Sequence, residues 1–166
     1  GDREKAIPAL QRLVEADARL REFKGVALLA LARWQSDAAV PYCTKALTAE
    51  TDTSHVERCI EYLAARKVKA AIPVMIRNSE KYKETVVRAL GQIGDAAGKA
   101  GVKAYLEETA KSPWVRAPGL VAAINLGDES AWAEYTLLLN GKRPEVKKDA
   151  PAKAKKRNKR AKAAAP

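Results

Sequence analysis

The chain has 166 residues, a length that fits one domain and a tail. Apolar residues make up 47% and charged residues 31%, which is compatible with a soluble protein that buries a hydrophobic core. Aromatic residues make up only 5%, so Ala, Leu, Val and Ile must build that core, which favours close-packed helices over a β-sandwich. No membrane span is expected, because the longest apolar run covers only residues 26–32, whereas a span needs about 18.

The net charge of +11 is concentrated at the C-terminus. Residues 1–140 carry 20 basic and 18 acidic residues, whereas residues 141–166 carry 11 basic and two acidic ones. Val146 is the only large aliphatic residue of the second segment, so we expect a disordered basic tail there and a folded domain before it. The tail cations expected to contact an anionic partner are Lys153, Lys155, Lys156, Arg157, Lys159, Arg160 and Lys162.

A short motif recurs along the folded domain. Ala-Ile-Pro at residues 6–8 returns as Ala-Val-Pro at 39–41 and as Ala-Ile-Pro at 71–73, at offsets of 33 and 32 residues. Each copy opens an apolar run with helical spacing, and proline is tolerated in a first helical turn. The repeat therefore predicts a series of helix pairs, each about 30 residues long.

The dipeptide Gly-Asp follows two of the predicted second helices, at residues 94–95 and 127–128. Glycine takes the left-handed conformation that ends a helix, and aspartate then accepts hydrogen bonds from the first N–H groups of the next helix. We therefore expect a tight corner at each site. The predicted helices cover residues 3–16, 20–34, 37–49, 54–66, 69–78, 82–93, 97–110, 113–126 and 129–139.

This pattern resembles that of the HEAT-repeat family, in particular its short bacterial form. In that form a Val-Arg, Ala-Leu, Gly and Leu/Ile-Gly-Asp series is followed by Ala-Ile/Val-Pro-x-Leu. The resemblance covers residues 3–139 and implies an all-α fold, an α-solenoid of about four helix hairpins plus a final helix. Two departures are Arg-Lys-Val-Lys at 66–69, where Gly-Asp belongs, and Pro-Gly at 118–119, which predicts a kink or a late helix start.

Two cysteines lie in the helices of the second predicted hairpin. Cys43 and Cys59 are each eight residues from a turn near Thr51, so they stand level with each other and share their faces with aliphatic residues. They are either buried thiols that act as small hydrophobes or a disulfide. A zinc site is not expected, because the chain has one histidine and no CxxC pair.

Catalytic and cofactor motifs are missing from the sequence, including a phosphate-binding loop, HExxH and GxSxG. His55 is expected at the surface, because no nucleophile and carboxylate converge on it. Trp34, Trp114 and Trp132 lie at predicted helix ends, where such rings usually fill corners, the alternative being that Trp114 faces a ligand. We therefore expect no enzyme, no cofactor and no bound metal.

The resemblance implies that the second helix of each pair lines a concave binding face. The residues expected on this face are mostly basic and include aromatic rings, which suits a protein segment or an acidic polymer. The alternative is that these residues only keep the surface hydrated. The residues expected on this face are Lys24, Arg58, Glu61, Tyr62, Lys83, Arg88, Gln92, Trp114 and Arg116.

We therefore expect a non-enzymatic scaffold that binds another protein through the concave face. The tail would add a sequence-independent contact to nucleic acid or another polyanion, without aromatic residues on which bases could stack. Two alternatives stay open: a HEAT-like protein that holds DNA or RNA in the groove, and a HEAT-like lyase or chaperone subunit. The expected location is cytoplasmic, with a periplasmic or secreted one open because a removed signal would leave no trace.

Overall fold

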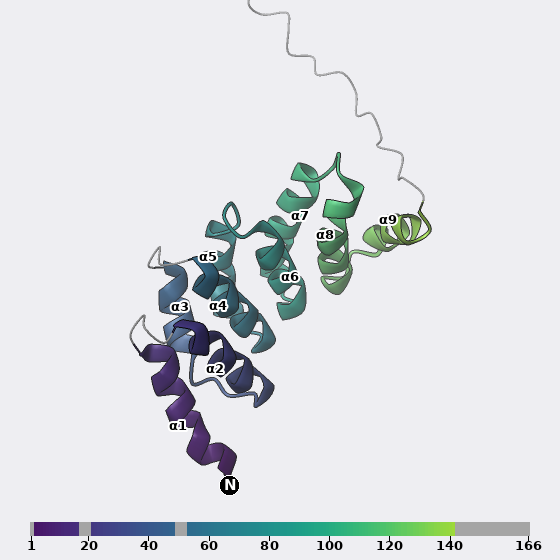
Figure 1. Ribbon diagram of the computed structural model, residues 1–166. Helices are drawn as coiled ribbons and strands as arrows, with labels where there is room; N and C mark the ends of the chain where they lie inside the picture. Colours follow the sequence, from purple (N-terminus) through teal and green to yellow (C-terminus); the bar gives the residue numbers. More distant parts are fainter. Residues whose placement is uncertain (1, 17–20, 49–52, 142–166) are drawn as a thin grey trace, which may run out of the picture.

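The computed structural model describes residues 2–16, 21–48 and 53–141 (Figure 1). Within these ranges the chain has nine α-helices, two short 3₁₀ turns and no strand, which confirms the all-α part of the predicted fold class. The helices are α1 (Asp2–Glu15), α2 (Arg21–Arg33), α3 (Val40–Thr48), α4 (Thr53–Ala65), α5 (Ile72–Arg77), α6 (Lys83–Ile93), α7 (Lys99–Glu108), α8 (Pro113–Asn125) and α9 (Glu129–Leu139); the turns are η2 (Lys69–Ala71) and η3 (Ala96–Gly98). None of these helices is long and apolar enough to span a membrane.

Two sequence predictions fall outside the described residues. One is the turn near Thr51. The other is the basic tail, of which only Gly141 is described, so its seven named cations are not placed.

The helices follow one another along an elongated array from α1 to α9 (Figure 1). Successive helices pack in pairs, α1 on α2, α3 on α4, α5 on α6 and α7 on α8, and α9 packs on α8. The even-numbered helices also contact one another in order, α2 on α4, α4 on α6 and α6 on α8. They therefore form one continuous layer, and the odd-numbered helices α1, α3, α5 and α7 are paired with its members.

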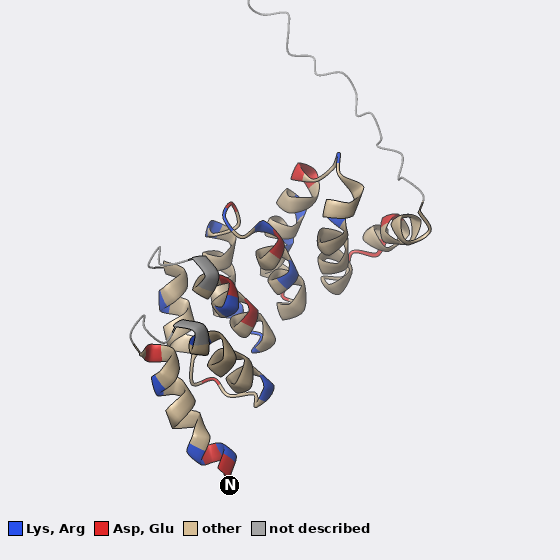
Figure 2. Ribbon diagram, viewed as in Figure 1, with Lys and Arg blue, Asp and Glu red and all other residues tan. Residues whose placement is uncertain are grey.

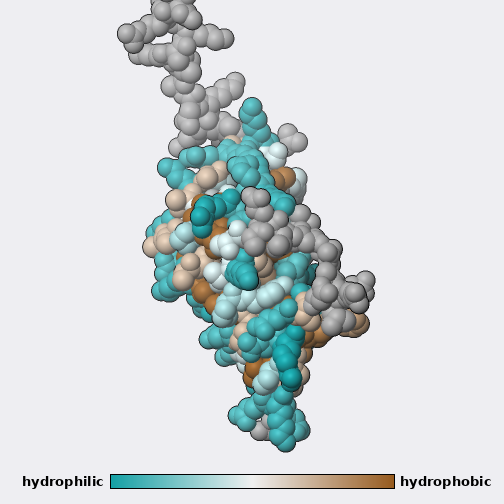
Figure 3. All heavy atoms as spheres, turned by 90° about the vertical axis from the view of Figure 1, so that its left-hand side faces the viewer, coloured by the Kyte–Doolittle hydropathy of each residue, from teal (hydrophilic) through white to brown (hydrophobic). Residues whose placement is uncertain are grey.

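The core lies between the paired helices and is mainly aliphatic, as the low aromatic content predicts. Residues three positions apart on one face of each helix enter it, such as Leu28 with Leu31 in α2 and Ile60 with Leu63 in α4. Burying a side chain of this size stabilises the fold by about 1.5–3 kcal/mol. The outward side that faces left in Figure 1 is mostly hydrophilic, with scattered apolar patches (Figure 3).

Glycine followed by aspartate ends one helix and begins the next, as predicted. Gly94 ends α6 with φ 72°, and Gly127 follows α8 with φ 84°. Asp95 and Asp128 then each accept a hydrogen bond from the backbone N–H two residues further on, at 3.0 Å. The predicted corners are therefore confirmed at both sites.

The first two corners have the same backbone geometry without a glycine. Gln35, after α2, has φ 55°, and Lys67, after α4, has φ 52°. Their N–H groups bond back to the preceding turn at 3.0 and 2.9 Å. The departure from Gly-Asp at residues 66–69 therefore does not change the turn, although a side chain at positive φ is disfavoured by about 1–2 kcal/mol.

Replacing Lys67 with glycine is expected to raise the free energy of unfolding by about 1 kcal/mol, because it relieves the left-handed strain. Urea denaturation of the purified protein measures the change. Lys103→Gly is the matched control: Lys103 lies inside α7, where glycine should destabilise by about 1 kcal/mol. A loss of stability in Lys67→Gly would contradict the assigned backbone geometry.

The cap at Asp128 should make stability depend on pH. Hydrogen bonds from Ser130 lower the pKa of Asp128, so its carboxylate stabilises the fold above the ordinary carboxyl pKa and loses that effect as pH falls through the lowered value. Asp128→Ala is expected to lose about 1 kcal/mol at neutral pH and less in acid. Asp128→Asn should keep the cap without the titration. Denaturation at neutral and at acid pH measures the free energy of unfolding lost in Asp128→Ala. Equal losses at the two pH values would refute the predicted pH dependence.

Two helices begin three residues later than predicted, α3 at Val40 and α5 at Ile72, the latter after the 3₁₀ turn η2. The Asp37 carboxylate, just before α3, bonds to Arg66 at 2.7 Å. Of the two alternatives predicted for Pro118, a kink or a late start, the late start is wrong, because α8 begins at Pro113 and continues through Pro118. Proline removes one backbone donor from that helix, but packing on α6, α7 and α9 holds it.

Candidate binding groove

Three adjoining hollows lie over the even-numbered helices. The first, about 500 Å³, is between α2 and α4; the second, about 520 Å³, is between α4 and α6; the third, about 410 Å³, is between α6 and α8. Gln92 lines all three, Glu61 lines the first two and Arg88 lines the last two. The hollows therefore form one continuous groove, which we call the groove below.

Both ends of the groove are apolar. At the α2 end, Val26 is 67% exposed and Leu29 is 55% exposed. At the α8 end, Val121 is exposed beside Ala117 and Pro118. Large apolar side chains that stay exposed inside a hollow are typical of a surface that another molecule covers.

The middle of the groove is charged but balanced. It is lined by three acidic residues and three basic ones: Glu57, Glu61, Glu84, Lys81, Lys83 and Arg88. Arg88 is paired with Glu84, and at the edge Arg58 is paired with Glu61 at 2.7 Å. Figure 2 shows this mixture of signs along α4 and α6. The predicted basic bias of the surface is therefore offset by its own carboxylates.

Five of the nine residues predicted for the binding face do line the groove and are open to solvent at least in part. They come from α4 and α6, the two helices at its centre (Figure 1). These residues are Arg58, Glu61, Lys83, Arg88 and Gln92. Lys83 also bonds to Glu108 of α7, which raises the pKa of its ammonium group.

Two predicted face residues are buried. Lys24 is only 8% exposed, and its ammonium lies against Tyr42. The ring of Tyr62 forms part of the groove wall, but its hydroxyl donates to the Ser36 carbonyl at 2.6 Å and accepts from the Ala39 N–H at 3.2 Å. Neither polar group is free to bind a ligand, so the prediction for both is wrong.

Arg116 holds helices together instead of facing a ligand. Its guanidinium bonds to both carboxylate oxygens of Glu134 in α9, at 2.7 and 2.9 Å, and to the Leu106 carbonyl of α7. The pair is largely shielded, with side chains 14% and 27% exposed. Arg116 therefore connects α7, α8 and α9.

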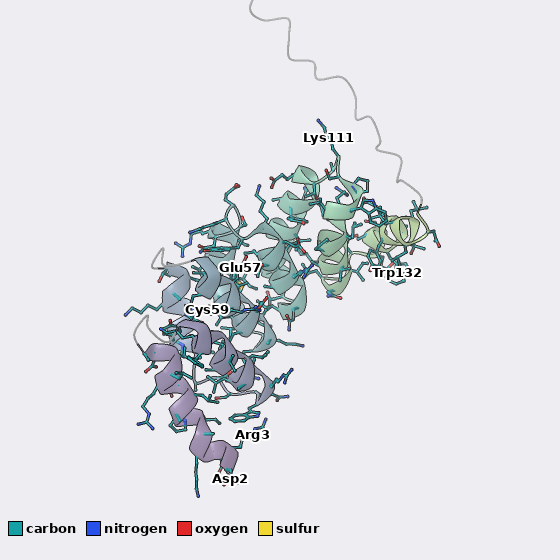
Figure 4. All side chains as sticks on the ribbon, in the orientation of Figure 1. Asp2, Arg3, Glu57, Cys59, Lys111 and Trp132 are labelled. Atoms are coloured by element: carbon teal, nitrogen blue, oxygen red, sulfur yellow. The ribbon has the colours of Figure 1, made fainter. Side chains whose placement is uncertain are left out.

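The tryptophans do not behave alike. Trp34 is half-buried with the Arg3 guanidinium 5.6 Å from its ring centroid, as expected of a corner residue. Trp114 is 74% exposed at the start of α8 and lines none of the three hollows. Trp132 is also exposed, at the α9 end of the array (Figure 4). Its ring centroid lies 6.2 Å from that of Tyr135. The corner prediction is therefore wrong for Trp114 and Trp132.

A polar cluster surrounds the two cysteines. Cys43 and Cys59 are fully buried, free thiols that face each other, so the disulfide is not formed. His55, expected at the surface, is partly exposed, and its ring also reaches inward: its Nε2 lies 2.6 Å from the Tyr42 hydroxyl and 3.7 Å from Cys59 Sγ. Lys24 Nζ lies 3.4 Å from the same hydroxyl. We call these five residues the thiol cluster (Cys59 is labelled in Figure 4).

The two thiols of the cluster differ in acidity. A hydrogen bond from Cys43, the nearby His55 and the Lys24 cation lower the pKa of Cys59, against the effect of burial. Burial raises the pKa of Cys43 and raises that of Tyr42 to about 12. The sequence predicts that the cysteines stand level with each other, but it does not indicate their polar neighbours. Lys24 comes from α2, and the packing of α3 on α4 brings Tyr42 and His55 together.

Within the described ranges, no group of three or more His, Cys, Asp or Glu side chains could hold a metal ion. No family model, no curated protein and no solved structure matches this chain. The groove and the thiol cluster are therefore the features from which a function can be argued.

Proposed function

We propose that the chain is a HEAT-like α-solenoid that binds a segment of another protein in the groove and performs no catalysis of its own. Two features support the solenoid. The helices pack in successive pairs with one layer that runs through all even-numbered members. Each of those members is followed by a left-handed corner, at residues 35, 67, 94 and 127, as expected of a repeated unit.

The observation that carries the proposed function is the groove with exposed apolar ends. The free energy of binding becomes more favourable by about 25 cal/mol for each Å² of apolar surface that a partner covers at Val26, Leu29 and Val121. Apolar side chains of a protein segment can supply that cover, while the paired charges in the middle can hydrogen-bond to its backbone or polar residues. The segment would lie along the groove from α2 to α8.

The charges in the groove favour a protein over a nucleic acid. Phosphate binding requires cations that are free to replace counterions. Arg58 and Arg88 are each bonded to a carboxylate, and Lys83 is shared by Glu80 and Glu108. A nucleic acid in this groove would have to approach these carboxylates as well as the cations.

Photo-crosslinking tests the proposed function. A photoreactive amino acid is placed at Leu29, at Val121 or, as a control on α3, at the exposed Lys45. The same protein should be captured from both groove positions and not from Lys45, with its crosslinked peptide identified by mass spectrometry. Capture from Lys45 alone, or of unrelated proteins from the two groove positions, would refute the proposal.

The basic tail is proposed to contact nucleic acid or another polyanion without sequence selection. Deleting residues 142–166 is expected to remove most binding to duplex DNA at low salt, measured by fluorescence anisotropy. In the full chain, log K should fall by about 0.9 per phosphate contact for each log unit of salt. Tight, salt-resistant DNA binding by the truncated chain would instead favour nucleic acid in the groove.

A further inference from the structure

The thiol cluster contains a buried cation that no carboxylate of the described residues pairs with. Lys24 of α2 is 8% exposed, and no described carboxylate forms an ion pair with it. Its ammonium contacts the hydroxyl and the ring face of Tyr42, at 3.4 Å and 5.4 Å. An ammonium group in the interior is unfavourable unless an anion or hydrogen bonds compensate it. The cluster therefore favours a negative charge nearby.

Cys59 is the group best placed to carry that charge. His55, one turn earlier on α4, lies 3.7 Å from its sulfur, and the Cys43 thiol of α3 faces it. These neighbours and Lys24 lower the pKa of Cys59, whereas burial and the neighbouring Cys59 raise the pKa of Cys43. The two thiols thus differ as an attacking thiolate and a protonated second thiol do.

We propose that Cys43 and Cys59 form a peroxide-reactive thiol pair, with Cys59 as the attacking residue and Cys43 as the resolving residue. The oxidant is hydrogen peroxide, which is close to water in size. Cys43 and Cys59 are fully buried, but His55, which contacts Cys59 Sγ, is only half-buried, so one side chain separates this sulfur from solvent. A bulky disulfide such as oxidised glutathione cannot contact sulfurs that have no exposed surface.

The chemistry balances with one peroxide and the two thiols. The Cys59 thiol first gives its proton to His55. The resulting thiolate attacks one peroxide oxygen, the O–O bond breaks, and the leaving hydroxide takes that proton from the Tyr42–His55 pair to become water. Cys59 is now a sulfenic acid. The Cys43 sulfur attacks it, the S–O bond breaks, and a disulfide forms as the hydroxide leaves with the Cys43 proton as a second water. Two thiols are oxidised and one peroxide is reduced.

Peroxide treatment of the full chain, followed by intact mass measurement, tests the overall reaction. The expected product has lost two hydrogens and has no free thiol after denaturation. With Cys43→Ser, the reaction should stop at the sulfenic acid, so that dimedone, present while the chain is denatured, labels Cys59. With Cys59→Ser, dimedone should not label Cys43. Labelling of Cys43 in place of Cys59, or no reaction in the native chain, would overturn the proposal.

The role of the buried cation has its own test. Lys24→Met should move the midpoint of the oxidation rate against pH upward by about one unit and, at pH values below that midpoint, slow peroxide oxidation about tenfold. Lys67→Met, which removes an exposed cation after α4, should leave the rate unchanged. The wild-type rate against pH needs no variant. Its midpoint should lie below the ordinary thiol pKa, and a midpoint at the ordinary value would contradict the assignment of Cys59.

Discussion

Replacing Gly91 with alanine is expected to lower the free energy of unfolding by about 2–3 kcal/mol, which is large for the addition of one methyl group. A Cβ at Gly91 would lie 2.6 Å from Ala122 Cα, so α6 and α8 meet backbone to backbone at this point. Rotation of a side chain cannot relieve a contact with backbone, and the two helices must move apart. Urea denaturation of the wild type and the variant measures the loss.

Gly25→Ala is the matched control for Gly91→Ala. Gly25 is also a helix-interior glycine, but the nearest atom to its added Cβ is Arg58 Cγ at 3.8 Å, an ordinary contact. Alanine is favoured over glycine inside a helix by about 0.8–1 kcal/mol, so this variant should be more stable than the wild type. Changes of the same sign in both variants would contradict the close packing of α6 on α8.

Replacing Arg116 with methionine is expected to lower the free energy of unfolding by about 2–4 kcal/mol, below the full range for a buried ion pair because Glu134 is partly exposed. Methionine keeps much of the side-chain volume but leaves the Glu134 carboxylate and the Leu106 carbonyl without their donor. Thermal or urea denaturation measures the loss, and adding Glu134→Gln should recover part of it.

The control for Arg116 is an exposed ion pair of the same composition. Arg58 bonds to Glu61 at 2.7 Å, with both side chains more than half exposed. Arg58→Met should therefore change the free energy of unfolding by less than about 1 kcal/mol. An Arg116→Met variant no less stable than Arg58→Met would show that the contact between α8 and α9 does not depend on this pair.

The helices could be predicted because their signals are local. Apolar residues recur at helical spacing, Pro41 and Pro73 stand in first turns and Gly-Asp marks two corners, so each of the nine predicted helices has a counterpart in the structure. The proline of the first copy, Pro8, lies inside α1 instead of in its first turn. The left-handed corners at Gln35 and Lys67 could not be predicted in this way, since no glycine marks them. Packing of the next helix imposes that conformation on residues that do not prefer it.

The sequence predicts a site residue correctly only where its side chain lies near the centre of the polar face of its helix. Arg58 and Arg88 point into the groove as their helical positions indicate. Lys24 and Arg116 are long polar side chains whose direction depends on which neighbour lies beside them, Tyr42 in one case and Glu134 in the other. Such pairings come from the packing of separate helices, and the spacing within one helix does not contain them.

The affinity of the protein recovered by crosslinking tests the central claim, that the groove is a protein-binding surface. Calorimetric titration would compare the wild type with Leu29→Asp and Val121→Asp, one at each end of the groove, and with Lys45→Asp on α3. We expect each groove variant to raise Kd about tenfold or more, as loss of an interface anchor does, and Lys45→Asp to leave Kd unchanged. An unchanged Kd in both groove variants would contradict the claim that the groove binds a protein.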